Sequence, residues 1–307
     1  MIFEVLIPNL IPLYILIAMG FAAGRYMDVN LHSLATLLIY FVGPLVIFGA
    51  VAQMPLRLEF LYLPVCLGAA SLFVTLLSYK FAKVVFQRTN FPNLIAMASP
   101  TCNSGYFGLP VVIALFGAEA SGLYLLGNVG AEIVMVTVGY YFGARGNFNA
   151  RQSIIKVIRL PMIYGLLAGL AFNALGYELN ETFISFWTYF TGTWVVIGMM
   201  LIGVALGKPE RFTINWKLLN FLSAIKFILW PGIIFLAIIF DQNITQAFDP
   251  VIYGMFMVWG LCPLMANTVA YAAQLNVRPD EAAMCVLLTT FMALFLMPLG
   301  LHLTRLL

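Results

Sequence analysis

Ten apolar stretches run through this chain, each long enough to cross the hydrocarbon core of a bilayer as a helix of about 20 residues. Closed membrane barrels would show alternating segments of about ten residues instead. With 63% hydrophobic residues, 9% charged residues and a mean hydropathy of +1.00, the chain leaves no room for a soluble domain. The sequence therefore predicts an all-α polytopic membrane protein with ten transmembrane helices. The stretches are 5–24, 31–52, 60–82, 93–116, 121–143, 160–176, 183–206, 218–240, 250–274 and 281–304.

The basic residues of the connecting loops gather on one side of this bundle. Because cytoplasmic loops carry an excess of Lys and Arg, we expect a multi-pass protein of the plasma membrane, the inner membrane in a bacterium, with both termini outside the cytoplasm. The first segment lacks the basic start and cleavage site of a signal peptide, so we expect the first helix to be retained. The other side holds only Arg57 and Arg305. Of the 15 basic residues, 12 lie on the cytoplasmic side: Arg25, Lys80, Lys83, Arg88, Arg145, Arg151, Lys156, Arg159, Lys208, Arg211, Lys217 and Arg278.

A basic linker at 144–159 divides the chain into two halves of five spans, 1–143 and 160–307. An odd number of spans in each half forces the halves into opposite orientations, which is the inverted repeat typical of transporters. Weak sequence similarity supports this division, since "IPLYILIAMGFAAGRY" from Ile11 resembles "LPMIYGLLAGLAFNALGY" from Leu160. The linker is either a basic helix at the lipid interface or a solvated connection.

Two prolines interrupt equivalent spans of the two halves. Pro110 in the fourth stretch and Pro263 in the ninth lie 153 residues apart. Proline removes a backbone donor and clashes with the preceding turn, and Gly105 and Gly108 permit an unwound backbone, so we expect two half-helices in each span. The alternative is a helix that is only kinked at proline.

Backbone groups freed by such breaks are tolerated in a bilayer where they line an enclosed cavity, and the positive end of a half-helix attracts an anion. A carboxylate is the natural occupant. Tyr106 is placed to contact a ligand, or else it packs beside the glycines. We expect the substrate to be bound by Asn103, Ser104, Gly105, Tyr106, Pro110, Pro263, Asn267 and Thr268.

The chain resembles the auxin efflux carrier family, which includes plant auxin exporters and bacterial carriers of malonate and related acids. The resemblance rests on Asn103-x-Gly105-Tyr106-x-Gly108-x-Pro110 followed by "ALFG", and on "YFVGPLVIFGA", "IKFILWPGIIF" and "CPLMANTVAYAAQLNVRP". It implies ten helices in two inverted repeats, with the fourth and ninth helices broken and crossing. It also implies a scaffold of helices 1, 2, 6 and 7 that forms a homodimer, a transport domain of helices 3–5 and 8–10, and elevator-like movement of a small organic anion. A wider kinship of fold links the family to sodium-coupled bile acid carriers.

Two ionisable residues lie inside predicted spans, where charge is costly and usually functional. Glu132 lies near the middle of the fifth span, and Asn128 lies one turn before it on the same face. We predict that Glu132 binds a coupling ion, either a proton or a sodium ion shared with Asn128; the alternative is a protonated, structural Glu132. For Lys226, two turns into the eighth span, we expect the side chain to reach the cytoplasmic interface. Pairing between Glu132 and Lys226 would change both assignments.

Three classes of function can be compared for a membrane chain of this kind: a carrier, a channel or receptor, and an enzyme. A secondary carrier of a small organic anion explains the paired breaks, the inverted halves and the buried Glu together. A channel or ligand-sensing receptor on the same scaffold is the alternative. No nucleophile motif, metal cluster or ATP-binding loop is present in the sequence, so we expect no enzyme, no metal site and no cofactor besides the coupling ion. The net charge of +3 lies in the cytoplasmic loops and requires no nucleic acid partner.

Overall fold

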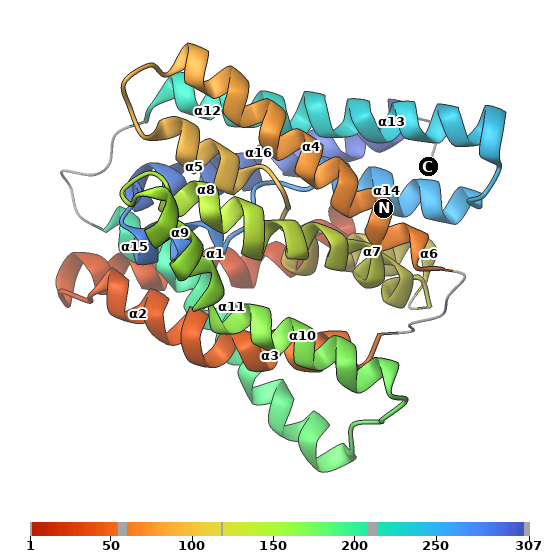
Figure 1. Cartoon of the computed structure of the whole chain (residues 1–307), viewed down its shortest axis with the longest axis horizontal. Helices are drawn as coiled ribbons and strands as arrows, with labels where there is room; N and C mark the ends of the chain where they lie inside the picture. The colour runs from red at the N-terminus through yellow and green to blue at the C-terminus, as the bar shows by residue number, and fades with distance from the viewer. Residues whose placement is uncertain (1, 55–59, 118, 208–213, 304–307) are drawn as a thin grey trace.

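The computed structural model describes residues 2–54, 60–117, 119–207 and 214–303, and the regular structure of these residues is helical throughout (Figure 1). Six helices are long and apolar enough to span a membrane, and a seventh span results if the bent pair 150–158 and 161–174 is counted as one. Three shorter apolar helices cover Ile11–Tyr26, Ser104–Phe116 and Pro250–Leu261. The expectation of an all-α membrane protein is therefore confirmed.

Each apolar stretch found in the sequence contains one or more of the helices. The five-residue segments labelled η are π-helical turns, most of which continue directly into an α-helix. In order, the elements are α1 (Ile2–Tyr26), α2 (Leu31–Leu37), η1 (Leu38–Val42), α3 (Gly43–Ala52), α4 (Tyr62–Val85), α5 (Phe91–Ala98), η3 (Ser104–Gly108), α6 (Leu109–Phe116), α7 (Ala120–Val134), η4 (Met135–Gly139), α8 (Tyr140–Ala144), α9 (Ala150–Ile158), α10 (Pro161–Ala174), α11 (Glu181–Leu206), α12 (Trp216–Ala224), η6 (Ile225–Leu229), α13 (Trp230–Phe240), η7 (Asp241–Thr245), α14 (Pro250–Leu261), α15 (Thr268–Leu275) and α16 (Pro279–Leu303).

Three prolines lie just after π-helical turns. Pro44 follows η1, Pro110 follows η3 and Pro231 follows η6, each at the first or second residue of the next α-helix. A proline inside a helix lacks one donor and pushes away the carbonyl of the preceding turn, and a widened π turn accommodates both effects. The helices therefore continue through these prolines instead of ending there.

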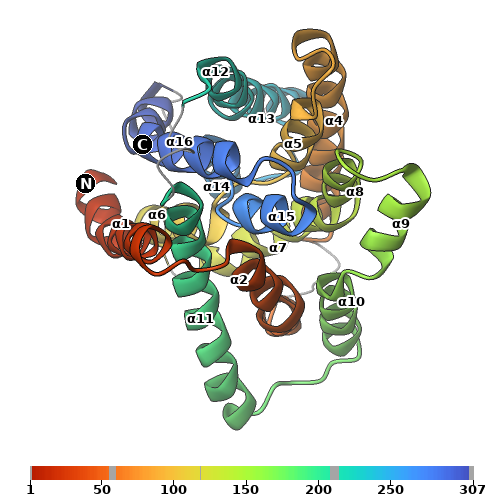
Figure 2. The ribbon, with the colours of Figure 1, turned by 90° about the vertical axis from the view of Figure 1, so that its left-hand side faces the viewer.

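The helices form two groups that pack against each other (Figures 1 and 2). In the first group, α1 packs along α11 and α3 packs along α10. In the second group, α4 packs along α7, while α14 and α15 pack against α16. Within the first group the backbones of α1 and α11 touch, because a Cβ at Gly203 would lie 2.0 Å from the Ile17 carbonyl oxygen and one at Gly20 would lie 2.2 Å from that of Met200.

The linker between the halves contains helix α9. The Asn149 side chain accepts a hydrogen bond from the Gln152 backbone N–H at 2.9 Å, and the Asn149 backbone N–H donates to Gln152 Oε1 at 3.2 Å. Residues Ala150–Ile158 of the predicted linker are therefore helical, while the choice between a helix at the lipid interface and a solvated connection stays open. Exposed isoleucines on α9 give it an apolar face: Ile154, Ile155 and Ile158.

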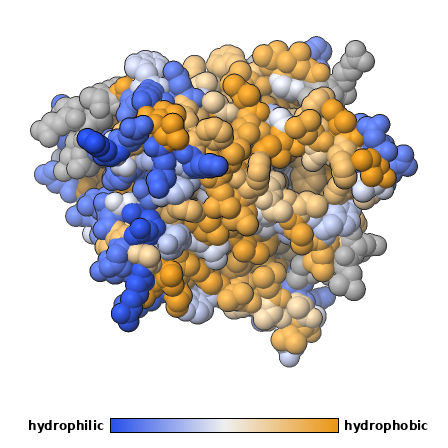
Figure 3. Space-filling model, turned by 45° about the horizontal axis from the view of Figure 1, so that its top comes forward, coloured by the Kyte–Doolittle hydropathy of each residue, from blue (hydrophilic) through white to orange (hydrophobic). Residues whose placement is uncertain are grey.

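The surface carries an apolar band between more hydrophilic ends (Figure 3). Large apolar side chains that are more than half exposed contribute to it, including Phe41, Val65, Ile228 and Leu236. Such a surface suits acyl chains rather than water. Among the basic residues used to predict orientation, Arg57, Lys208, Arg211 and Arg305 lie outside the described residues.

Gly203→Val should disrupt the contact between α1 and α11, because the new side chain meets the Ile17 backbone and neither helix can yield locally. We expect a loss of about 3 kcal/mol of stability, read as a lower melting temperature of the purified protein in detergent. Gly192→Val, on the same helix α11, is the matched control, since a Cβ there meets nothing within 4 Å. Equal melting temperatures for the two variants would contradict the close packing.

Candidate functional site

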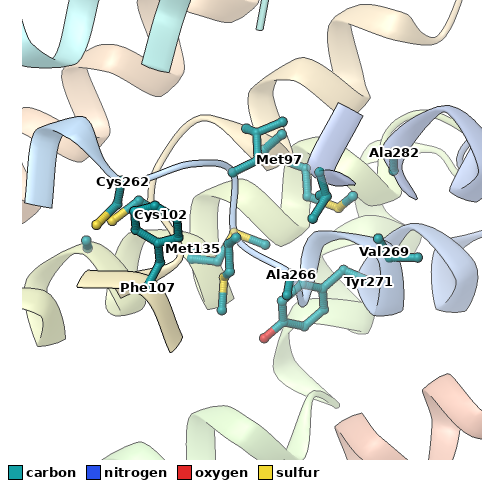
Figure 4. Close-up of a cluster of buried hydrophobic side chains, with 14 of the residues drawn as sticks. Met97, Cys102, Phe107, Met135, Cys262, Ala266, Val269, Tyr271 and Ala282 are labelled. Carbon is teal, nitrogen blue, oxygen red and sulfur yellow. The ribbon is translucent and has the colours of Figure 1, made fainter. Parts of the chain in front are cut away.

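Two unwound segments cross in the second group of helices. Residues 99–103 separate α5 from η3, and residues 262–267 separate α14 from α15. Cys102 and Leu264 form an isolated antiparallel bridge, and the Asn103 N–H donates to the Pro263 carbonyl at 2.9 Å. In Figure 4, Cys102 and Cys262 lie side by side at this crossing, above Phe107. The backbones of two helical breaks thus bond directly to each other.

The position of the first break differs from the prediction. The sequence predicts a break at Pro110, but Pro110 is the second residue of α6 and the chain is helical on both sides of it. The unwound segment lies earlier and contains Pro100, which has no N–H to continue α5. The wider π turn η3 makes room for the Pro110 ring, so the helix continues through Pro110. Pro263 does lie in the unwound segment that follows α14.

Carbonyl groups freed by the first break are bound by side chains of the α12–η6–α13 segment. The Trp230 indole N–H donates to the Ser99 carbonyl at 2.9 Å, and the Lys226 ammonium donates to the Thr101 carbonyl. In the second break, the Leu264 N–H lies 3.4 Å from the Thr289 hydroxyl of α16. These bonds supply partners that the bilayer interior does not.

Lys226 does not reach the cytoplasmic interface, so that prediction is wrong. Lys226 is 1% exposed. The physical reason is the freed Thr101 carbonyl, which offers the ammonium a partner inside the protein, next to the rings of Trp230 at 5.7 Å and Trp259 at 5.9 Å. No ion pair joins Lys226 to Glu132, both of which lie in the described part of the chain.

A cavity of about 390 Å³ lies between the crossing and the first group of helices. The crossing side supplies most of the predicted site residues, whereas Pro110, Pro263 and Thr268 do not line the cavity. The opposite wall is apolar and comes from α3, α10 and α11. Lining residues predicted from the sequence are Asn103, Ser104, Gly105, Tyr106, Asn128, Glu132 and Asn267; those the sequence analysis missed include Val46, Met162, Leu166 and Trp194.

Three lining side chains carry buried polar atoms without a hydrogen-bond partner: Tyr106 through its hydroxyl, Glu132 through Oε2 and Asn267 through Oδ1. The Tyr106 and Asn267 atoms converge on α11, because a Cβ at Gly198 would lie 3.8 Å from the first and 3.5 Å from the second. Unpaired polar atoms are costly in an apolar interior. Their convergence in one cavity indicates a binding site for a polar ligand.

The start of the η3–α6 helix points its free donors at the same cavity. The Phe107 and Gly108 N–H groups both donate to the Asn103 carbonyl, at 3.1 and 3.2 Å. The N–H groups of Ser104, Gly105 and Tyr106 precede these bonds, and no residue in the described ranges accepts from them. All three residues line the cavity, so the arrangement favours a ligand with negative charge.

Polar contacts also hold the Glu132 neighbourhood. The Trp259 indole N–H donates to Asn128 Oδ1 at 2.9 Å, joining α14 to α7. Asn128 lies one turn before Glu132 on α7, and both residues line the cavity. The structure therefore brings Glu132 and Asn128 to the same cavity as the crossing. Among the described lining residues, none is Lys, Arg or His.

Trp230→Phe keeps the aromatic ring but leaves the Ser99 carbonyl without its donor in the membrane interior. We expect a loss of about 2 kcal/mol, measured as a lower melting temperature in detergent. Trp216→Phe serves as the control, because Trp216 is 62% exposed at the start of α12. Equal melting temperatures of the two variants would mean that the bond between Trp230 and Ser99 does not stabilise the crossing.

A family model described as "Membrane transport protein" matches residues 5–301. The chain is also similar to an uncharacterized transporter of Methanocaldococcus jannaschii, with 26% identity over 234 residues that cover 72% of this chain and 75% of that protein. A transporter family agrees with a buried polar cavity between membrane helices and points away from an enzyme. The chain thus belongs to the membrane transport protein family of the auxin efflux carriers.

Proposed function

We propose that this protein is a secondary active transporter that moves a small organic anion, a mono- or dicarboxylate of the malonate or auxin type, by an elevator-like mechanism. The cavity at the crossing carries the proposal. It combines free backbone donors at a helix start with the unpaired polar atoms of Tyr106 and Asn267. A carboxylate accepts from such donors, and the apolar wall opposite accommodates the rest of a small acid.

The topology we propose has ten spans in two inverted repeats, 1–143 and 160–307. The long helices and the bent pair give seven of these spans. The remaining three come from the shorter apolar helices, two of which pair with α5 and α15 across the unwound segments. The direct bridge between Cys102 and Leu264 supports equivalent roles for the two breaks.

Alternating access requires the second group of helices to move against the first. Polar contacts cross this boundary where α2 meets α15. The Thr36 hydroxyl donates to Gln274 Oε1 at 2.9 Å, and His32 Nδ1 lies 3.2 Å from the Ala273 carbonyl oxygen. In the proposed mechanism these contacts hold one side of the cavity closed, and they break when the crossing moves.

Charge compensation supports a coupling ion at Glu132. A carboxylate substrate would share the cavity with the Glu132 carboxyl, and two like charges at close range in an apolar site repel strongly. A proton or a sodium ion on Glu132 removes this conflict, so that anion and cation would travel together as in a symporter. Transport would then be driven by the gradient of that ion.

The protein as a whole is proposed to act as a homodimer in the plasma membrane, with both termini outside the cytoplasm. The first group of helices offers exposed apolar residues for dimer contacts: Tyr164, Leu167, Phe186 and Tyr189. The loop charges described above support the orientation.

The test of the function is uptake into proteoliposomes. The purified protein is reconstituted, and radiolabelled malonate, other mono- and dicarboxylates and an indole acid are supplied with a proton gradient, a sodium gradient or none. Saturable, gradient-dependent uptake of one acid supports the carrier. Binding without flux under every gradient would favour a ligand-sensing receptor, and flux without saturation would favour a channel.

Asn103→Ala and Asn267→Ala should each weaken the affinity for the transported acid about tenfold, because each removes a polar group that faces the substrate. The measurement is the half-saturating concentration in the uptake assay. Asn243→Ala is the control, since Asn243 is exposed and its amide bonds only within its own turn. Unchanged affinity in both cavity variants would show that the crossing is not part of the binding site.

A covalent link across the moving boundary should stop transport. In the double variant Thr36→Cys with Gln274→Cys, a short bifunctional thiol reagent would tie α2 to α15, and we expect a loss of uptake that reduction of a cleavable linker restores. Tyr79→Cys with Phe142→Cys is the control, because these rings lie 4.4 Å apart within the second group. Undiminished uptake in the fully linked first pair would exclude relative movement at this boundary.

A further inference from the structure

We propose that α9 is an interfacial helix that binds an anionic lipid surface, with its isoleucines among the acyl chains and its arginines at the headgroup phosphates. This role selects the lipid interface over a solvated connection for the linker between the two halves. Lipid binding by α9 is independent of what the protein transports. Three features of α9 point to it: the place of the helix in the fold, its exposed face and its charge.

The helix α9 lies at the outer edge of one end of the molecule. Figure 2 views the structure from this end and shows α9 at the periphery, between α8 and α10. The axis of α9 is bent by 45° from that of α10. At the bend, the Tyr164 hydroxyl donates to the Ile158 carbonyl at 2.7 Å. Tyrosine is typical of the headgroup level of a membrane, so this bond sets the end of α9 at that level.

One face of α9 is buried, and the opposite face is apolar and exposed. The Ser153 hydroxyl is buried and donates to the Asn149 carbonyl at 2.8 Å, which fixes the inner face. On the outer face, Ile154, Ile155 and Ile158 are 51%, 37% and 56% exposed. Spacings of three and four residues place them in one stripe. Such a stripe is unfavourable in water and suits acyl chains.

The linker around α9 is basic. It contains Arg145, Arg151, Lys156 and Arg159, and it has no Asp or Glu from 144 to 159. Arg151 and Arg159 are exposed, and each lies four residues from Ile155 in the stripe. Within the described ranges, no ion pair joins these four basic side chains to a carboxylate. The phosphates of anionic lipids supply the complementary negative charge.

Protein contacts hold the other two basic groups beside the start of α9. The Lys156 ammonium lies 4.2 Å from the centre of the Phe148 ring, and the Arg145 guanidinium donates to the Phe148 carbonyl at 2.8 Å. An arginine has five N–H donors, so Arg145 keeps donors for a phosphate. Long basic side chains also keep their stems on apolar surface while the charge extends to the headgroups.

Other occupants of this face fit less well. An acidic soluble partner would match the charge of the linker but would leave the isoleucine stripe without a hydrocarbon environment. A second copy of the chain would bring two basic linkers together, and like charges repel. A lipid surface with anionic headgroups matches both the stripe and the charge.

Spin labelling measures the depth of the exposed face. The full-length protein carries Cys66→Ser, which removes an exposed cysteine, and is labelled at Ile158→Cys in vesicles of phosphatidylcholine and phosphatidylglycerol. We expect oxygen, which concentrates in lipid, to relax the label more than a water-soluble nickel chelate does, as at Ile228→Cys in the apolar band. Glu178→Cys, in the exposed segment before α11, is the solvent control.

Two results of the labelling experiment would overturn the proposal. A label at Ile158 that responds to the nickel chelate as the label at Glu178 does would show a solvated linker. Spectral broadening between labels of two protomers would show that a second copy of the chain covers the face.

The role of the charge is tested with the double variant Arg151→Gln and Arg159→Gln. We expect its affinity for phosphatidylglycerol, titrated into the full-length protein in detergent and read by native mass spectrometry, to fall about tenfold. The matched control is Lys80→Gln with Lys83→Gln, which removes the same charge from α4. Equal losses in the two double variants would show a diffuse attraction of all basic loops and would exclude a site on α9.

A second variant keeps the charge and removes the apolar stripe. Ile154→Ser with Ile158→Ser should weaken phosphatidylglycerol binding in the same assay, because the acyl chains lose their contact. Unchanged affinity would mean that headgroups bind without insertion of the helix, and would overturn the interfacial position. None of these measurements requires transport, so a protein that carries no acid leaves the assignment of α9 standing.

Discussion

Every backbone group released where a helix unwinds inside a bilayer must find a partner within the protein, since lipid offers none. This protein releases such groups twice, at 99–103 and 262–267, and satisfies them by letting the two segments cross. The bond from Asn103 to Pro263 uses one donor and one acceptor of the two breaks. Two further carbonyls of the first break, those of Ser99 and Thr101, accept from Trp230 and Lys226, which therefore lie inside the protein. The arrangement of the second group of helices follows from this requirement.

The same requirement creates the site. Backbone donors at the start of η3 remain free because a helix start has no preceding turn to bond to. They open on a cavity whose far wall belongs to the other group of helices. In the proposed function a ligand held there would touch both groups, which is the geometry that alternating access needs. Gly198 of α11 lets the Asn267 and Tyr106 side chains approach that helix, since a Cβ there would lie 3.5 Å from Asn267 Oδ1 and 3.8 Å from the Tyr106 hydroxyl.

Lys226 and Glu132 are both buried in the protein, and no ion pair joins them. Their surroundings differ. The ammonium is tied to a backbone carbonyl and to two indole rings, so it stabilises the crossing. The carboxyl lines the cavity with one oxygen free. The free oxygen of Glu132 beside the cavity is the reason for the coupling role proposed for it.

The sequence by itself determined the membrane class and the helical content, and it led to Asn103–Tyr106 as the proposed site, because hydropathy, proline and glycine act locally. Tertiary structure decided the rest. Pro110 did not break its helix, since a π turn upstream absorbed it. Lys226 turned inward because a carbonyl 125 residues earlier lacked a partner. The apolar wall of the cavity could not be predicted from the sequence. Residues such as Leu166 are equally apolar whether they face lipid or a cavity, and only the packing of the helices distinguishes these two positions.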